Sequence, residues 1–233
     1  MKTIAFCLLA SLALSACTTG IKSSSTINNP DSDVTQFPVE TAVINIFTKE
    51  YSDSLYSLLS DKKSLEFDYK IIPKAASNFE NQQIQSVQSI SSTSIDNEVI
   101  TRNIRMSYFT LNPFLFKGYT SSSGEYSVAT QSAILPRVAN VGSSGKSVAA
   151  IVYSDSSKSN QIRSYTEKWS LSKASQNTAW FCMEELAHGN LAFKKKKIQC
   201  FEIDEHGDIL DSKIIETYKT EVGVKTIEVI SRL

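Results

Sequence analysis

The chain has 233 residues, 41% of them hydrophobic, and its 24 Lys and Arg side chains balance 24 Asp and Glu side chains. This composition excludes a collagen-like, coiled-coil or wholly disordered chain. Because binding to a phosphate backbone requires an excess of cationic side chains, the balanced charge also argues against nucleic acid as the main partner.

Residues 1–16 have the organisation of a secretory signal peptide. A lysine at the second position precedes an apolar stretch that is too short to span a bilayer. The stretch closes with Leu14-Ser15-Ala16-Cys17, which resembles the lipobox of bacterial lipoproteins. The resemblance implies that Cys17 becomes the first residue of the mature protein and carries the acyl chains that anchor it in a membrane.

Thr18 follows the cysteine at the position where an aspartate retains enterobacterial lipoproteins in the inner membrane. The resemblance therefore implies sorting to the outer membrane, with the protein facing the periplasm. Residues 17–40 are rich in Ser, Thr, Asn and Asp and show no apolar period, which predicts a flexible tether. Residues 41–233 are expected to form a single β-rich periplasmic domain.

Apolar and polar residues alternate in several segments, as they do in strands with one buried face. Two such faces consist of Leu65, Phe67, Tyr69 and Ile71, and of Ile100, Ile104, Met106 and Tyr108. Short clusters of Ser, Gly, Asn and Asp separate these segments and predict hairpins. The expected fold is mainly β, an antiparallel β-sandwich or partly open β-barrel of about 8 to 11 strands.

One or two short helices are expected beside these strands. The candidates are residues 52–60, which begin with capping-type Ser52 and Asp53, and residues 81–90, where Ile84, Val87 and Ile90 recur every third residue. Both segments are short, and irregular strands are the alternative interpretation.

Cys182 and Cys200 are the cysteines that remain after signal removal and acylation, and an oxidising compartment favours a disulfide between them. If they face each other on neighbouring antiparallel strands, Trp180 opposes Glu202. The apolar core face of this hairpin would then contain Phe181, Met183, Phe201 and Ile203. The pairing requires a wide loop over about residues 187–195 and a Cα separation below about 7 Å.

His188 and His206 are the two histidines of the chain, and each lies near carboxylates and beside a glycine. This setting is typical of solvated turn residues. The alternative function is a periplasmic hydrolase or metal-dependent enzyme that uses these histidines with the neighbouring carboxylates. The sequence contains neither the zinc-protease spacing of histidines nor a Gly-x-Ser-x-Gly elbow, so no catalytic residue, metal site or cofactor is predicted.

Aromatic side chains are densest in one short segment, at Tyr108, Phe109, Phe114, Phe116 and Tyr119. Most such clusters belong to a core, whereas exposed rings would line a hydrophobic groove for a lipid tail or a partner strand.

The one run of charge consists of Lys194, Lys195, Lys196 and Lys197. These lysines could bind anionic headgroups or protect the edge of a sheet from aggregation. Alternation along a strand would send neighbouring lysines to opposite faces, which favours the structural interpretation.

Together these patterns predict a lipid-anchored binding or structural protein of the outer membrane. An envelope protein or an amphiphile would bind through main-chain pairing at a sheet edge or through the aromatic groove. A third hypothesis, a lipid carrier, requires an apolar cavity of at least about 300 Å³ inside the sheet.

Overall fold

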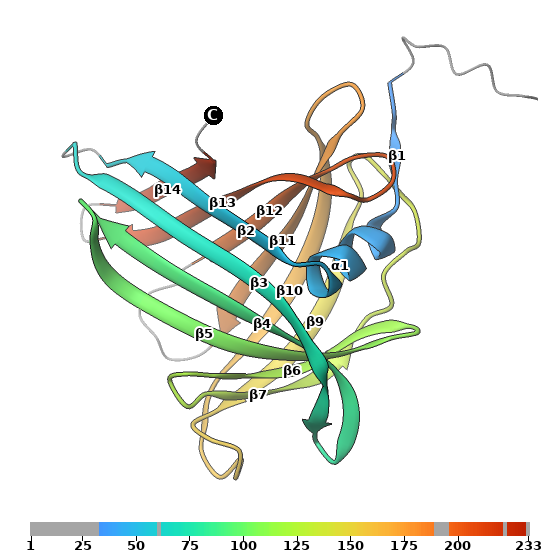
Figure 1. The fold of residues 1–233 in the computed structure, drawn as a ribbon, viewed down its shortest axis with the longest axis vertical. Coiled ribbons are helices and arrows are strands. Elements are labelled where there is room, and N and C mark those ends of the chain that lie inside the picture. The colour runs from blue at the N-terminus through green and yellow to red at the C-terminus, as the bar shows by residue number, and fades with distance from the viewer. Residues whose placement is uncertain (1–32, 60–61, 189–195, 221–222, 232–233) are drawn as a thin grey trace, which may run out of the picture. The chain divides into compact units, whose positions relative to one another are not determined.

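The computed structural model describes residues 33–59, 62–188, 196–220 and 223–231. The predicted signal peptide, Cys17 and most of the predicted tether therefore lie outside the described residues. Twelve antiparallel strands close into a barrel (Figure 1). In chain order the barrel strands are β2 (Tyr51–Leu58), β3 (Ser64–Phe79), β4 (Gln82–Ile95), β5 (Glu98–Leu111), β6 (Phe114–Ser121), β7 (Tyr126–Ser132), β9 (Ser144–Tyr153), β10 (Gln161–Lys173), β11 (Ala179–His188), β12 (Lys196–Ile203), β13 (Ile209–Thr220) and β14 (Gly223–Ser231).

Three further elements complete the described chain. The short strands β1 (Gln36–Phe37) and β8 (Ala139–Asn140) pair with each other, and α1 (Val39–Thr48) is the one helix of the described residues. No helix in this part of the chain is long and apolar enough to cross a membrane. Ordered structure thus begins before residue 41, where the sequence placed the start of the domain.

The barrel is an up-and-down meander, because each barrel strand pairs with the next one along the chain. The mainly antiparallel β fold predicted from the sequence is confirmed, but the sheet is closed and has twelve strands, more than the 8 to 11 expected. Closure joins β14 to β2 through Ile230 opposite Tyr56 and Ser231 opposite Leu55. Since every barrel strand has a neighbour on both sides, the barrel leaves no edge strand that a partner could extend.

Helix α1 packs its apolar face against the interior of the barrel. Val39, Ala42, Val43 and Ile46 recur at helical spacing, and all four are buried. Their cluster contains Phe109, Trp169, Phe181 and Phe201 from the strands, which places the helix against one end of the barrel, as Figure 1 shows.

Main-chain and side-chain hydrogen bonds fix α1 to two connections between strands. The Glu40 amide donates to the carbonyl of Pro136 at 3.2 Å, and Asn45 Nδ2 donates to the carbonyl of Gly207 at 2.8 Å. The chain segments that precede β9 and β13 therefore hold the helix in place. This end of the barrel is consequently covered.

The two segments proposed as helices are strands. Residues 52–60 fall largely in β2 and residues 81–90 largely in β4, each paired along its length with β3. The apolar residues of these segments recur at helical spacing by coincidence. Most of the positions between them are serines and glutamines, and both segments pair with β3 as strands.

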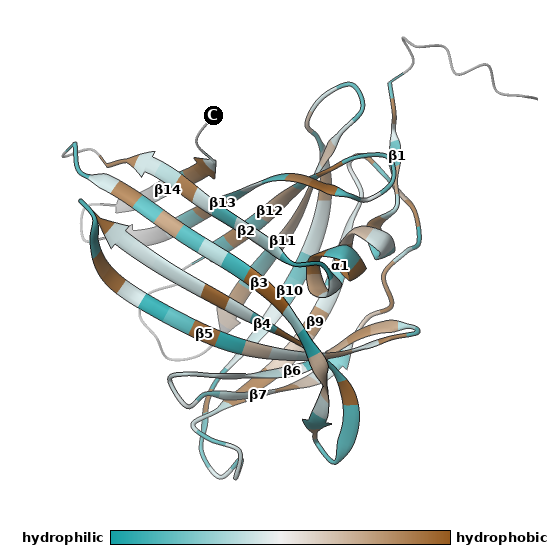
Figure 2. Cartoon of the chain, in the orientation of Figure 1, coloured by the Kyte–Doolittle hydropathy of each residue, from teal (hydrophilic) through white to brown (hydrophobic). Residues whose placement is uncertain are grey.

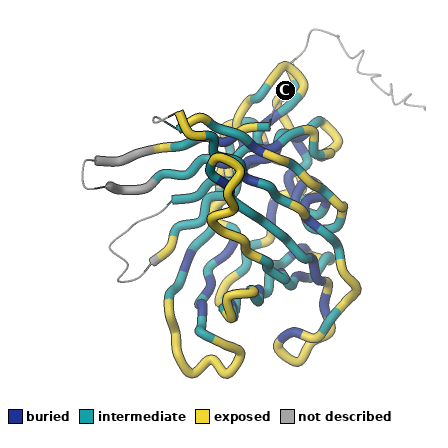
Figure 3. The backbone as a smooth tube through the Cα atoms, turned by 60° about the vertical axis from the view of Figure 1, so that its left-hand side comes forward, coloured by how far each residue is buried: buried dark blue, intermediate teal, exposed yellow. Residues whose placement is uncertain are grey.

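Alternation of apolar and polar residues is visible along the barrel strands (Figure 2). Buried positions concentrate within the strands, whereas the hairpin connections are exposed (Figure 3). The interior contains two smaller apolar clusters besides the one at α1. One lies between β6, β9 and β10 around Tyr119, Val152 and Tyr165, and the other joins β2 to β14 around Leu55 and Val229.

The disulfide between Cys182 and Cys200 is present, with a Cα separation of 4.0 Å. The predicted register is confirmed, since Trp180 opposes Glu202 and the strands on either side of the loop end at His188 and resume at Lys196. The predicted core face is confirmed as well, because Phe181, Phe201 and Ile203 are fully buried.

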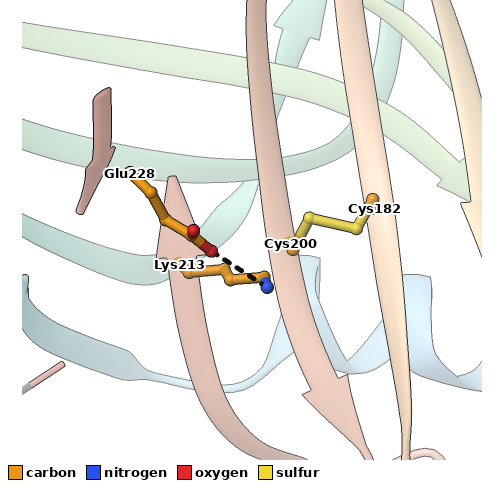
Figure 4. Close-up of a disulfide and its surroundings, with 4 residues drawn as sticks. All are labelled: Cys182, Cys200, Lys213 and Glu228. Carbon is orange, nitrogen blue, oxygen red and sulfur yellow. Dashed lines mark ion pairs between the residues drawn. A yellow bond between two sulfur atoms is a disulfide. The ribbon is translucent and has the colours of Figure 1, made fainter. Parts of the chain in front are cut away.

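On the outer face beside the disulfide lies an ion pair. The Lys213 ammonium is 3.1 Å from the Glu228 carboxylate and 4.4 Å from the centre of the Trp180 ring (Figure 4). Cys200 is nevertheless buried, with 1% of its surface exposed. Cys200 is therefore shielded although it does not face the barrel interior, and Cys182 is partly exposed.

Candidate functional site inside the barrel

A cavity of about 130 Å³ lies within the barrel, between α1 and the middle of the strands. Val43, Ile46 and Phe47 of α1 line it on one side, and Arg105 and Glu185 line it on the other. Its volume is close to that of cavities that hold a benzene-sized molecule. It is smaller than the roughly 300 Å³ that the lipid-carrier hypothesis requires, so that hypothesis gains no support.

The walls of the cavity are mostly apolar, and they come from eight strands on different sides of the barrel. They include Ile71, Val87, Phe114, Val148, Trp169 and Phe181. A few polar groups interrupt these walls, notably Ser89 on β4, Ser107 on β5 and Gln199 on β12. Apolar walls with a small number of convergent polar groups are the usual composition of a small-molecule site.

Arg105 is the most unusual residue of the cavity. It projects inward from β5 on the same face as Ser107, and its guanidinium carbon lies 3.9 Å from the centre of the Tyr119 ring. Its Nε atom is enclosed and has no hydrogen-bond partner. Among the described residues Arg105 also makes no contact ion pair with a carboxylate, although Glu185 in the same cavity wall acts on it through its charge.

A second arginine nearby is fully paired. Arg163 donates to Glu185 and to Glu125, each at 3.2 Å, and to the hydroxyl of Tyr119 at 2.6 Å. The same hydroxyl donates to Glu125 at 3.0 Å. Both carboxylates are therefore hydrogen-bonded to Arg163, and Glu185 acts on Arg105 through its charge without contacting it.

Glu167 lies in the cavity wall on β10, and Ser147 Oγ donates to its carboxylate at 3.0 Å. Burial raises the pKa of Glu167 to about 7, because enclosure disfavours the charged form. Burial also raises the pKa of Tyr69, Tyr119 and Tyr165, which keeps these phenols neutral. Below pH 7 the Glu167 carboxyl is therefore mostly protonated and does not offset the charge of Arg105.

The aromatic cluster predicted from the sequence is divided between the two faces of the barrel. Phe114 and Phe116 line the cavity, and Phe109 packs behind them against the ring of Phe47 at 5.2 Å between centroids. Tyr108 projects to the opposite face of β5 and stacks on Phe79 at 4.3 Å. Part of the cluster thus belongs to the candidate site, but as walls of an internal cavity instead of an external groove.

The lysine run does not form a patch in the described residues. Lys196 pairs with Glu184 at 3.0 Å, whereas the Lys197 ammonium lies 4.9 Å from the centre of the Phe67 ring. Neighbouring lysines therefore project to opposite faces, as alternation predicted. Lys194 and Lys195 lie outside the described residues.

The two histidines do not share a site. His206 lies in the connection between β12 and β13 with 74% of its side chain exposed, 3.6 Å from Glu205. The backbone of His188 ends β11, at the other end of the β11–β12 hairpin. Among the described residues no three His, Cys, Asp or Glu side chains lie close enough to hold a metal ion. The alternative enzyme hypothesis therefore finds no common centre for these histidines.

Sequence reasoning missed Arg105 because it assigned the wrong face of β5 to the core. It grouped Ile104, Met106 and Tyr108 as the buried face, but Arg105 and Ser107 are the residues that line the cavity. The usual pattern of apolar residues inside and polar residues outside is reversed on β5, because Arg105 and Ser107 line the interior. A charged residue between two apolar ones is indistinguishable, in one sequence, from an ordinary solvent-facing position.

Comparisons with known proteins give no basis for assigning this chain to a family. No family model matches the chain, and no significant match was found among curated proteins or solved structures. The geometry of the cavity is therefore the basis for a functional proposal.

Proposed function

We propose that this chain is a binding protein of the bacterial envelope, anchored to the outer membrane through acylated Cys17, which holds a small apolar or amphiphilic molecule inside its barrel. The observation that supports this proposal is the cavity of about 130 Å³ between α1 and Arg105. Apolar walls would enclose the body of the ligand, and the polar groups opposite α1 would orient one end of it.

Trp169 provides a direct probe of occupancy. It lies in the cavity wall, whereas Trp180, the other tryptophan, belongs to the outer face beside the disulfide. In the mature chain carrying Trp180→Phe, all tryptophan emission therefore comes from the cavity. Titration with benzyl alcohol, a neutral ligand of about benzene size, is expected to give a saturable change in that emission.

A cavity-filling variant tests where this ligand binds. Ser107→Leu places a larger side chain in the cavity and is expected to abolish the fluorescence change. Ser172→Leu makes the same substitution at an exposed position of β10 and is expected to leave it unaltered. A titration without saturation, or one that Ser107→Leu does not affect, would overturn the proposal.

A further inference from the structure

The two arginines inside the barrel differ in their contacts, although Glu125 and Glu185 together match their two positive charges. Arg163 interacts with both Glu125 and Glu185, so its charge is compensated within the chain. Arg105 interacts through its guanidinium face with the Tyr119 ring, but its edge makes no hydrogen bond. An enclosed cation without a hydrogen-bonded anion is costly, and folded proteins rarely retain one without a use for it.

From this guanidinium without a hydrogen-bond partner we propose that the ligand of the cavity is an organic monoanion whose carboxylate binds the edge of Arg105. The inference rests on the proposed function, because it names the chemical class of the molecule held at the same site. Stacking on Tyr119 fixes the plane of the guanidinium, and no described residue accepts a hydrogen bond from its edge. That edge presents parallel N–H donors, which match the two oxygens of a carboxylate.

The groups around Arg105 favour a single negative charge on the ligand. Glu167 on β10 and Glu185 on β11 face the same space as Arg105, and Gln199 on β12 is neutral. Two acidic side chains beside one free cation would repel a second negative charge on a ligand. Phosphate esters and dicarboxylates are therefore disfavoured, whereas a monocarboxylate with an apolar body satisfies both the cation and the walls.

The size of the cavity limits the apolar body. About 130 Å³ accommodates a ring such as that of benzoate or a short chain such as that of hexanoate. The same carboxylate chemistry also occurs at the head of a long-chain fatty acid, whose tail would have to leave the cavity past α1. Hexanoate and dodecanoate distinguish these two sources.

The test uses Trp169 emission in the mature Trp180→Phe chain, with benzoate, benzyl alcohol and benzylamine as ligands of similar size and different charge. At pH 6, benzoate is expected to bind at least about tenfold more tightly than benzyl alcohol, and benzylamine more weakly than both. Arg105→Gln should remove the preference for benzoate over benzyl alcohol. Arg102→Gln, an exposed position on the same strand, should leave the preference intact.

The outcomes separate this inference from the proposed function. If benzyl alcohol binds and benzoate binds no more tightly, the carboxylate inference is overturned and the proposed function stands. If none of the three ligands binds, the proposed function itself fails. Because the comparison of benzoate with benzyl alcohol needs no change at Arg105, it remains decisive even if Arg105→Gln does not fold.

The chain-length ligands then identify the source of the carboxylate. Binding of hexanoate without dodecanoate indicates a small free acid, and binding of both indicates a fatty acid whose tail passes α1. Either result supports the inference if Arg105→Gln abolishes binding of the acid. Binding of either acid that survives Arg105→Gln would contradict it.

Discussion

Arg105 and Tyr119 form a stacked pair inside the barrel, with the guanidinium carbon 3.9 Å from the ring centroid. The hydroxyl of the same ring accepts a hydrogen bond from Arg163 at 2.6 Å and donates one to Glu125 at 3.0 Å. One tyrosine therefore contacts both interior arginines, one through its face and the other through its oxygen. Substitutions of Tyr119 can therefore measure separately what its ring and its hydroxyl contribute to stability.

Tyr119→Leu should lower the free energy of unfolding by about 3 to 5 kcal/mol, because it removes a fully buried ring together with its cation–π contact. Tyr119→Phe should cost only about 1 to 2 kcal/mol, since Arg163 and Glu125 remain paired with each other. Urea denaturation measures both values. Equal losses for the two variants would show that the ring face contributes nothing beyond the hydroxyl.

Glu167 should make stability fall as the pH rises from about 5 to 7. Its pKa is about 7 in the folded chain against an ordinary value of 4.5, so the folded state binds more protons in this interval than the unfolded state does. The stabilisation is complete below pH 4.5 and is lost as the pH approaches 7. The upper limit of the effect is about 3 kcal/mol.

Glu167→Gln removes this titration. The stability difference between the variant and the unaltered chain should therefore shift in favour of the variant between pH 5 and pH 8. Urea denaturation at both pH values measures the shift. A parallel pH dependence of the two proteins would contradict the assignment of a raised pKa to Glu167.

The sequence predicted the structure correctly where a strand has an apolar face toward the interior and a polar face toward the exterior. The hairpin of Cys182 and Cys200 is such a case: the assumed pairing of the two cysteines gave its register, and the apolar face with Phe181 and Phe201 indicated which side is the core. At Arg105 the same reasoning failed, since the interior there is polar. The helix α1 was not predicted. Its buried residues pack against apolar residues at one end of the barrel, and a single sequence does not show that the strands leave such a surface to be covered.

Closure of the barrel could also not be predicted from local sequence patterns. Each hairpin can be predicted from alternation and turn residues, but the pairing of β14 with β2 joins residues far apart in the chain, such as Ile230 and Tyr56. No local signal distinguishes an open meander from a closed one. The convergence of Arg105, Glu167 and Glu185 depends on that closure, so the candidate site could not be assembled from the sequence.

Gly118 should tolerate no side chain. It has a φ of 150°, and a Cβ atom there would lie 2.0 Å from the carbonyl oxygen of Ser127 and 2.7 Å from the ring of Phe79. Gly118→Ala should therefore destabilise the protein by more than about 3 kcal/mol, because the main chain of β6 and β7 would have to separate. Thermal denaturation measures the loss.

Gly142→Ala is the matched control. Gly142 also has a positive φ, of 90°, but a Cβ atom there would meet no neighbour within 4 Å. Only backbone strain remains, at a cost of about 1 to 2 kcal/mol. A similar loss at both positions would show that the close approach of Ser127 and Phe79 is not what requires Gly118.

The disulfide should stabilise the barrel by about 3 kcal/mol, because it closes a loop between residues 18 apart and restricts the unfolded chain. Replacement of both Cys182 and Cys200 by serine should therefore lower the melting temperature. Reduction of the unaltered chain should give a similar decrease and should not further affect the double variant. If reduction lowers the melting temperature of the double variant as well, the loss comes from another effect of the reductant.

Anchoring should depend on Cys17 alone. In cells that express the full chain, Cys17→Ser should abolish incorporation of labelled palmitate and release the protein from the membrane fraction, because the proposed thioether-linked chains would provide the anchor. Cys7→Ser changes the other cysteine of the first 17 residues and should leave labelling intact, since Cys7 belongs to the signal peptide that the proposal removes. Labelling that persists in Cys17→Ser, or that is absent from the unaltered chain, would contradict the lipoprotein proposal. Because the residues that line the cavity lie between Val43 and Gln199, ligand binding measured through Trp169 should be the same for Cys17→Ser and for the unaltered chain.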